Sequence, residues 1–274
     1  MKDSLKRNRN WSAQVLTAVA GFVDLAGWVV LYHIYTANMT GNTVAAGLRM
    51  GRGEWIRAAA RLLPVAAFAV GVLANGLVIR WAARREPKRL VFPLIMAAEA
   101  VLLAAFLGLG LWLLPPDRLT APTPGAWVAL ASVAGLSMGM QNGALATSGA
   151  LSIYTTHVTG TLTTMMEYVA EYLVWLKDRA WGRGRRGFAR ALRVTPRQRC
   201  ARLAALHFRL WLFYLAGAAA GAVALDRLGV WCLAAPIAAV VATGGAALLW
   251  PVELPKPLGE GTSSPRGVVV RRSE

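Results

Sequence analysis

Gly21-Phe22-Val23-Asp24 and, after a short gap, Tyr35-Thr36-Ala37-Asn38-Met39-Thr40-Gly41-Asn42 form a pattern that this chain carries twice. The second copy reads Gly139-Met140-Gln141-Asn142 and then Tyr154-Thr155-Thr156-His157-Val158-Thr159-Gly160. When Thr40-Gly41 is set on Thr159-Gly160, Gly21 falls near Gly139, Asp24 near Asn142 and Asn38 on His157. In both copies an apolar run ends at a Thr-Gly pair, where a new helix-like segment starts. In a hydrophobic chain this duplication predicts a repeat-built transporter whose site lies at the two breaks.

Long apolar runs dominate the rest of the chain. Of its 274 residues, 56% are hydrophobic and only 16% are charged, against roughly 25% charged in a soluble domain. Most of the runs approach the roughly 20 residues that cross a bilayer, and the first lacks the small-residue cleavage site of a signal peptide. We therefore expect an all-α, polytopic transmembrane helical bundle. The runs cover residues 15–35, 62–79, 90–114, 127–153, 210–225 and 230–250.

The formal net charge is +17, and the basic residues gather in four groups. The largest group occupies one connection, residues 177–202, and the others lie at 80–89, before the first run and in the tail. Basic loops are retained in the cytoplasm, so we expect both termini and this connection on the cytoplasmic side. We expect the connection to contact anionic lipids. We expect no nucleic-acid partner, because such a module needs a fold beneath its charge.

The number of spans depends on the two segments that follow the Thr-Gly pairs. Residues 40–50 are too few to cross about 30 Å at about 1.5 Å per residue, so this segment reads as a half-helix. Residues 159–176 are long enough to cross but carry Glu167 and Glu171. If both segments dip without crossing, the chain has two inverted repeats, each with about three spans plus a half-helix. If both cross, it has eight spans in two parallel sets of four. We favour the six-span arrangement.

The predicted organisation follows from these boundaries. A cytoplasmic N-terminal segment (1–11) precedes the first transmembrane repeat (12–114). An external proline-rich loop (115–125) leads to the second repeat (126–250), which contains the basic cytoplasmic loop 177–202. Residues 251–274, rich in proline, glycine and basic residues, form a disordered tail.

The two breaks supply the candidate binding residues. Thr40 and Thr159 are good N-cap residue types, and Gly41 and Gly160 allow close backbone approach. A helix that begins inside the membrane directs unpaired N–H groups and the positive end of its dipole into the site, which suits an anionic or zwitterionic solute. The alternative is that Thr-Gly only caps helices at the interface. The predicted substrate-binding residues are Asn38, Thr40, Gly41, Asn42, Gln141, Asn142, His157, Thr159 and Gly160.

Asp24 is the predicted proton-coupling residue. A lone carboxylate at mid-span is costly, so it marks a functional position by default. The alternative is a hydrogen bond between helices. Glu99 and, next to an apolar run, Arg209 are the other charges that look buried in the sequence, and we expect them to pair across helices.

The sequence predicts no enzymatic activity, no metal site and no cofactor. The chain has three histidines and two distant cysteines, Cys200 and Cys232, which give neither metal-ligand spacing nor a disulfide framework. Gly135-Leu136-Ser137-Met138-Gly139 matches the nucleophile-elbow pattern of hydrolases. That pattern works on a strand-to-helix turn, whereas here it lies inside a helical apolar run.

The residues around both breaks resemble the YoaK-like family of bacterial multi-pass membrane proteins, a domain of unknown function. The resemblance covers residues 12–250, and the block Met39-Thr40-Gly41-Asn42-Thr43 is its most specific part. Gly143 departs from the family, where alanine is usual, and the segment after Thr159 is unusually long. The resemblance implies a bacterial inner-membrane location and supplies no substrate.

Two hypotheses of different classes remain. The first is a secondary transporter or permease for a small anionic or zwitterionic solute, proton-coupled through Asp24. The second is a non-transporting membrane scaffold or lipid-binding protein that uses the basic loop; an intramembrane enzyme ranks third. The sequence leaves the oligomeric state open, a homo-oligomer included.

Overall fold

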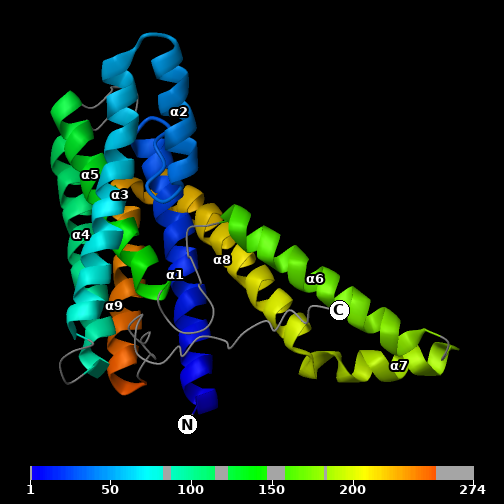
Figure 1. The fold of residues 1–274 in the computed structure, drawn as a ribbon. Coiled ribbons are helices and arrows are strands. Elements are labelled where there is room, and N and C mark those ends of the chain that lie inside the picture. Colours follow the sequence, from blue (N-terminus) through cyan, green and yellow to red (C-terminus); the bar gives the residue numbers. More distant parts are fainter. Residues whose placement is uncertain (1, 83–87, 115–122, 147–157, 182–183, 251–274) are drawn as a thin grey trace, which may run out of the picture.

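The computed structural model describes residues 2–82, 88–114, 123–146, 158–181 and 184–250, and this part of the chain is helical without strands. Figure 1 shows most of the helices side by side in one bundle, from which α6, α7 and the first part of α8 project. The helices are α1 (Lys2–Val30), α2 (Met39–Gly51), α3 (Trp55–Ala82), α4 (Val91–Leu113), α5 (Pro124–Ala146), α6 (Val158–Ala180), α7 (Gly184–Val194), α8 (Arg199–Leu228) and α9 (Ala234–Leu249). Short 3-10 turns η1 (Lys88–Leu90), η2 (Thr195–Arg197) and η3 (Gly229–Leu233) precede α4, α8 and α9.

Four helical stretches of the described residues are long and apolar enough to cross a membrane: Asn10–Val30, Trp55–Ala82, Val91–Leu113 and Arg199–Leu249. The last contains two helices, because the chain turns at η3, where Gly229 has a φ of 58° that favours glycine. Figure 1 shows α8 rising to this turn and α9 descending from it. The expectation of an all-helical chain with several helices able to cross a membrane is therefore confirmed for the described residues.

α1 and α8 form one of two tightly packed helix pairs. A Cβ added at Gly21 would collide with the carbonyl oxygen of Tyr214, and one added at Gly217 with that of Ala18. Glycine therefore lets the two backbones touch, as in membrane helices with small residues at their interface. The two helices run in the same direction, since Gly217 meets Ala18 and Gly221 meets Phe22 one turn later.

α3 and α5 form the second tight pair by the same device. A Cβ at Gly71 would collide with the carbonyl oxygen of Leu136, and one at Gly139 with that of Phe68. These two helices are also parallel to each other, since Gly135 meets Pro64 and Gly139 meets Phe68.

The two tight pairs run in opposite directions. Trp127, near the start of α5, donates from Nε1 to the carbonyl of Leu31 just beyond α1, at 3.2 Å. Gln141, near the end of α5, donates from Nε2 to the carbonyl of Leu16 in the first half of α1. α1 and α5 are therefore antiparallel.

The remaining packing follows a matched pattern. α2 packs on α3 and α6 packs on α8; α4 packs on α5 and α9 packs on α1; α4 and α9 also pack on each other. The two halves of the chain therefore make equivalent contacts. If α1, α2, α3 and α4 correspond in that order to α5, α6, α8 and α9, each of these contacts made by one half has its counterpart in a contact made by the other.

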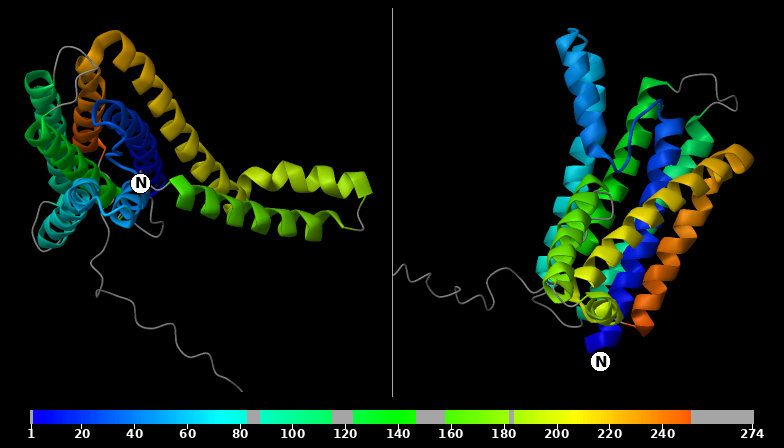
Figure 2. Two further views of the ribbon diagram at one scale, coloured as in Figure 1. Left: turned by 90° about the horizontal axis from the view of Figure 1, so that it is seen from above. Right: turned by 90° about the vertical axis from the view of Figure 1, so that its right-hand side faces the viewer.

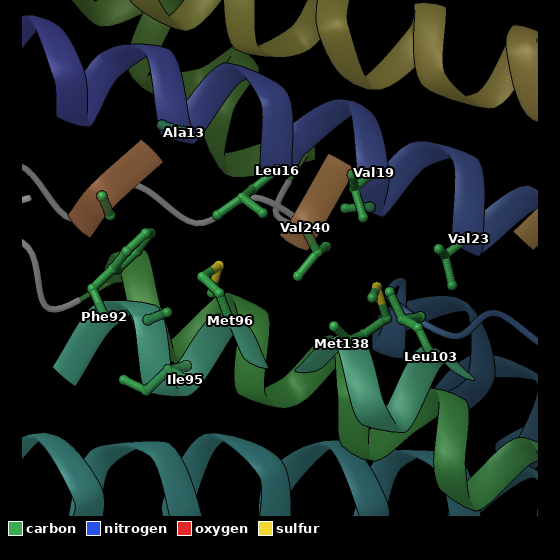
Figure 3. Close-up of a cluster of buried hydrophobic side chains, with 14 of the residues drawn as sticks. Ala13, Leu16, Val19, Val23, Phe92, Ile95, Met96, Leu103, Met138 and Val240 are labelled. Atoms are coloured by element: carbon green, nitrogen blue, oxygen red, sulfur yellow. The ribbon is translucent and has the colours of Figure 1, made fainter. Parts of the chain in front are cut away.

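Two clusters of buried apolar side chains fill the bundle. Figure 3 shows the lower cluster, in which Leu16 and Val19 of α1 face Met96 of α4, with Val240 of α9 between them. The upper cluster contains Phe106, Leu130 and Leu233. Together they join α1, α4, α5, α8 and α9.

Several sequence expectations change in the structure. The first apolar run stops being helical at Val30, five residues before its predicted end at 35. The described parts of the basic connection 177–202 are mainly helical rather than loop, because α6 continues to Ala180 and α7 and α8 follow. Figure 2 shows these helices extending away from the bundle. Glu99 does not pair with Arg209, which is exposed on α8.

Candidate functional site

The candidate site is the break between α1 and α2, where the chain reverses and runs back along α1. Tyr32 and His33 have positive φ angles of 54° and 64°, which are uncommon for residues other than glycine. Arg61 of α3 holds this turn by donating to the carbonyls of His33 and, at 3.2 Å, Tyr32. The reversal lets α2 begin beside Asp24, in the last third of α1, instead of beyond its end.

Asp24 fastens the returning segment to α1. Its Oδ1 accepts hydrogen bonds from the backbone N–H of Ala37 (2.7 Å) and of Asn38 (3.3 Å) and from the hydroxyl of Thr36 (3.4 Å). Its Oδ2 accepts from the hydroxyl of Tyr214 on α8 at 2.6 Å. Asp24 is 4% exposed, so these donors replace the water that the carboxylate has lost. One side chain thus joins α1, the break and α8.

The break is also closed from the side of α2. Asn42 is fully buried and pairs with the backbone of Tyr35: Nδ2 donates to its carbonyl at 2.7 Å and Oδ1 accepts from its N–H at 3.1 Å. A Cβ at Gly41 would lie 2.7 Å from the ring of Tyr35, and one at Gly27 would collide with the side chain of Thr36. The polar and glycine positions of the first motif therefore fold onto one another.

The N-terminus of α2 is capped by Asn38, whose Oδ1 accepts from the N–H of Gly41 at 3.3 Å. The expectation that Thr40 is the cap is therefore wrong: α2 begins at Met39, which places Thr40 inside the first turn. Asparagine caps a helix at least as well as threonine. Asn38 and Thr40 are exposed and Gly41 is half-buried, so the first turn of α2 presents an accessible polar surface.

The second break lies largely outside the described residues, and so does His157. Thr159 and Gly160 are described; they lie in the first turn of α6, exposed and half-buried respectively. In Figure 1, α6 begins at about the height at which α2 begins. α2 and α6 are not among the helix pairs of the described chain that pack together, because α2 packs on α3 and α6 on α8.

Gln141 and Asn142 lie apart from the first break. Gln141 is fully buried and bonds to the carbonyl of Leu16, eight residues before Asp24 and thus about 12 Å along α1. Asn142 is 9% exposed, and its Oδ1 has no partner among the described residues. The structure therefore gathers Asp24, Asn38, Gly41 and Asn42 at one break, and it separates Gln141 and Asn142 from them.

Two residues that hold the break were missed from the sequence. Tyr214 lies in an apolar run that gave no sign of its partner, although Gly217 and Gly221 beyond it mark a close helix contact. Arg61 reads in sequence as an ordinary charge near a helix end. Its role depends on the direction in which the carbonyls of Tyr32 and His33 point, which is set by their positive φ angles. The sequence does not reveal these angles.

A narrow apolar crevice without room for a water molecule lies away from the break. It is lined by residues of α1, α4, α8 and η3, among them Val30, Phe106 and Cys232. None of the predicted binding residues lines this crevice.

Comparison with known proteins places the chain among membrane proteins. It is 30% identical over 171 residues to the UPF0700 transmembrane protein YoaK of Bacillus subtilis (strain 168), an overlap of 62% of this chain and 72% of the relative. No solved structure matches the chain. A family model described as a protein of unknown function (DUF1275) matches residues 12–246. Because the family model covers most of the chain, this protein belongs to the DUF1275 family, that of the YoaK-like membrane proteins.

Proposed function

We propose that this protein is a secondary transporter or permease for a small anionic or zwitterionic solute. The proposal rests on the two glycine-packed helix pairs, α1 with α8 and α3 with α5. The helices within each pair are parallel, and the two pairs run in opposite directions. Inverted repeats with interrupted helices are the architecture of many secondary transporters, in which one body rocks against the other around a fixed site.

In this proposal each half of the sequence is one inverted repeat. The first repeat (12–114) supplies three spans, α1, α3 and α4, and the second (126–250) supplies α5, α8 and α9. α2 is a half-helix of about 20 Å, and α6 is its counterpart. The matched contacts of the two halves support this six-span arrangement over eight parallel spans.

The solute site of the proposal is the first turn of α2 and, in the other repeat, the first turn of α6. The Asn38 side-chain amide and the Thr40 hydroxyl are exposed donors at a helix N-terminus, which favours a carboxylate or another anion, whereas the N–H groups of Asn38 and Gly41 are already bonded to Asp24 and Asn38. Thr159 supplies an exposed hydroxyl at the same position of α6, beside Gly160. Asp24, with donors on both oxygens, anchors the break rather than carrying the coupling proton.

Flux measurements in proteoliposomes test the proposal. A panel of radiolabelled amino acids and small carboxylates is offered to the wild-type protein and to Thr40→Ala and Thr159→Ala. We expect saturable uptake of at least one solute by the wild type and an apparent affinity weakened several-fold in either variant. Thr43→Ala is the matched control, because Thr43 is also an exposed threonine of α2, with its hydroxyl bonded to the carbonyl of Met39 at 2.9 Å. Absence of uptake across the panel, or equal uptake by empty liposomes, would count against transport.

The lipid-binding scaffold remains the second candidate, because α7 and the end of α6 carry exposed aromatic and aliphatic side chains among arginines. Trp181, Phe188 and Leu192 are exposed, and Lys177 lies 5.2 Å from the ring centre of Trp181. A helix of this kind binds anionic lipid at the membrane surface. Under this candidate, charge reversal at Arg190 and Arg193 abolishes the ability of the protein to complement a strain that lacks it, and Thr40→Ala leaves that ability unchanged.

A further inference from the structure

Glu99 is a carboxyl group buried in the middle of the bundle that the proposed solute site does not use. It lies on α4, and it is 0% exposed. Neither of its carboxylate oxygens has a hydrogen-bond partner among the described residues. Asp24 differs, because both of its oxygens accept hydrogen bonds.

The elements packed against α4 supply no charge that compensates Glu99. α5 and α9 contain no ionisable side chain, and η3 contributes only the thiol of Cys232, which belongs to the upper cluster. The basic residues Lys88 and Arg89 of η1 lie about ten residues away, or about 15 Å along the helix. On α3, the basic side chains bond elsewhere: Arg57 to Glu54, Arg61 to the carbonyls of the break and Arg80 to the carbonyl of Gly76.

The same level of the bundle holds neutral oxygen atoms that also lack partners. Figure 3 shows Leu103 of α4 beside Met138 of α5. α4 and α5 run in opposite directions, so Glu99, one turn before Leu103, lies at about the level of Gln141 and Asn142. The buried polar atoms nearby in the fold that lack partners are Ser137 Oγ, Gln141 Oε1 and Asn142 Oδ1 on α5 and both Oδ1 and Nδ2 of Asn75 on α3, where Asn75 meets Gly143.

An ionised carboxylate without a partner in such a setting costs many kcal/mol, whereas a neutral carboxylic acid has an O–H that a nearby amide or hydroxyl oxygen can accept. We propose that Glu99 is the proton-binding site of the transporter: it holds one exchangeable proton in the closed bundle and releases it from the carboxyl oxygen to water when the two tight helix pairs move apart. The inference rests on the proposed transport function for its coupling role. The proton itself is a property of Glu99 that can be measured without a solute.

Infrared spectroscopy of the protein in lipid vesicles at neutral pH measures that proton. We expect a carbonyl band of a protonated carboxylic acid that disappears in Glu99→Gln and persists in the matched control Glu167→Gln, whose glutamate is exposed on α6. The band should shift in heavy water, because the proton exchanges. In wild-type protein grown with carbon-13 glutamate the band should move, which assigns it to a glutamate without any substitution. A band that stays in Glu99→Gln, that ignores the glutamate label or that never exchanges would overturn the proposal, and so would its loss when Na⁺ is added at constant pH.

Flux measurements then separate this inference from the proposed function. With a transported solute, Glu99→Gln should keep exchange across the membrane within about twofold of wild type and lose accumulation driven by a pH gradient. Gradient-driven accumulation by Glu99→Gln would overturn the coupling role while transport stands. A wild-type protein that shows the exchangeable band but moves no solute would instead contradict transport and, with it, the coupling role.

Discussion

At the scale of single residues, the most consequential contact joins Asp24 to Tyr214. The two residues lie 190 positions apart, and the hydroxyl donates to the carboxylate at 2.6 Å. The sequence indicated that Asp24 is a special position, because a carboxylate within an apolar run needs a partner. It could not identify Tyr214, since the pairing depends on how α1 and α8 are rotated about their own axes.

The Asp24–Tyr214 contact predicts the stability of Tyr214→Phe. Removal of the hydroxyl leaves one buried oxygen of Asp24 without a donor, which costs about 1–3 kcal/mol. We expect a lower melting temperature in detergent, measured by intrinsic fluorescence, and no such change in Tyr168→Phe on α6. In the double variant with Asp24→Leu, which keeps no group able to bond the hydroxyl, the combined loss of stability should be smaller than the sum of the two single losses, because both substitutions remove the same contact. Full additivity would mean that the contact does not contribute.

At the scale of elements, apolar run length predicted the long helices well, and short polar segments were harder to interpret. α3, α4, α5, α8 and α9 all lie over predicted runs. The cap of α2 was assigned to Thr40 instead of Asn38, because either residue type can cap a helix. The reversal of the chain decides which side-chain oxygen points at the free N–H groups of the first turn. Glu99 and Arg209 were wrongly paired because the sequence does not reveal which way the two helices turn these side chains.

Glycine contacts predict a matched pair of substitutions. Gly217→Ala and Gly71→Ala each force a methyl group against a backbone carbonyl of the facing helix, so each should destabilise the fold by about 1–3 kcal/mol. Gly108→Ala on α4 meets no atom within 4 Å and is the control; it should be neutral or slightly stabilising. Thermal unfolding in detergent measures all three. Equal stability of Gly217→Ala and Gly108→Ala would contradict the close packing of α1 and α8.

The turn between α2 and α3 should respond to acid. Hydrogen bonds from Arg49 at 2.7 Å and Arg57 at 3.1 Å lower the pKa of Glu54 below its ordinary value. A lowered pKa stabilises the folded turn above the unfolded-state pKa, and this contribution is lost as the pH falls through the folded-state pKa. Hydrogen exchange at Arg52 and Gly53, relative to other exposed backbone, should therefore rise at acidic pH in the wild type. In Glu54→Gln it should be raised already at neutral pH and change little with acid.

At the scale of the whole molecule, the six-span proposal predicts which exposed positions face the outside of the cell. Arg52→Cys, in the turn after α2, should react with an impermeant thiol reagent in intact cells, and Arg89→Cys and Arg193→Cys should be protected. All three arginines are exposed, and the native Cys200 and Cys232 are buried and can be replaced by serine beforehand. Protection at position 52 together with reaction at position 89 would select eight spans.

Each tight helix pair unites the two halves of the chain, and this has a consequence for biosynthesis. α1 is made long before α8, and until α8 arrives the glycine face of α1 has no backbone to touch and Asp24 has no hydroxyl donor. The amino-terminal half is therefore incompletely packed until α8 has been synthesised, and quality-control proteases can recognise it in this state. Expressed alone, residues 1–120 should be degraded rapidly, and co-expression of residues 121–274 should restore both fragments to a stable, co-purifying complex.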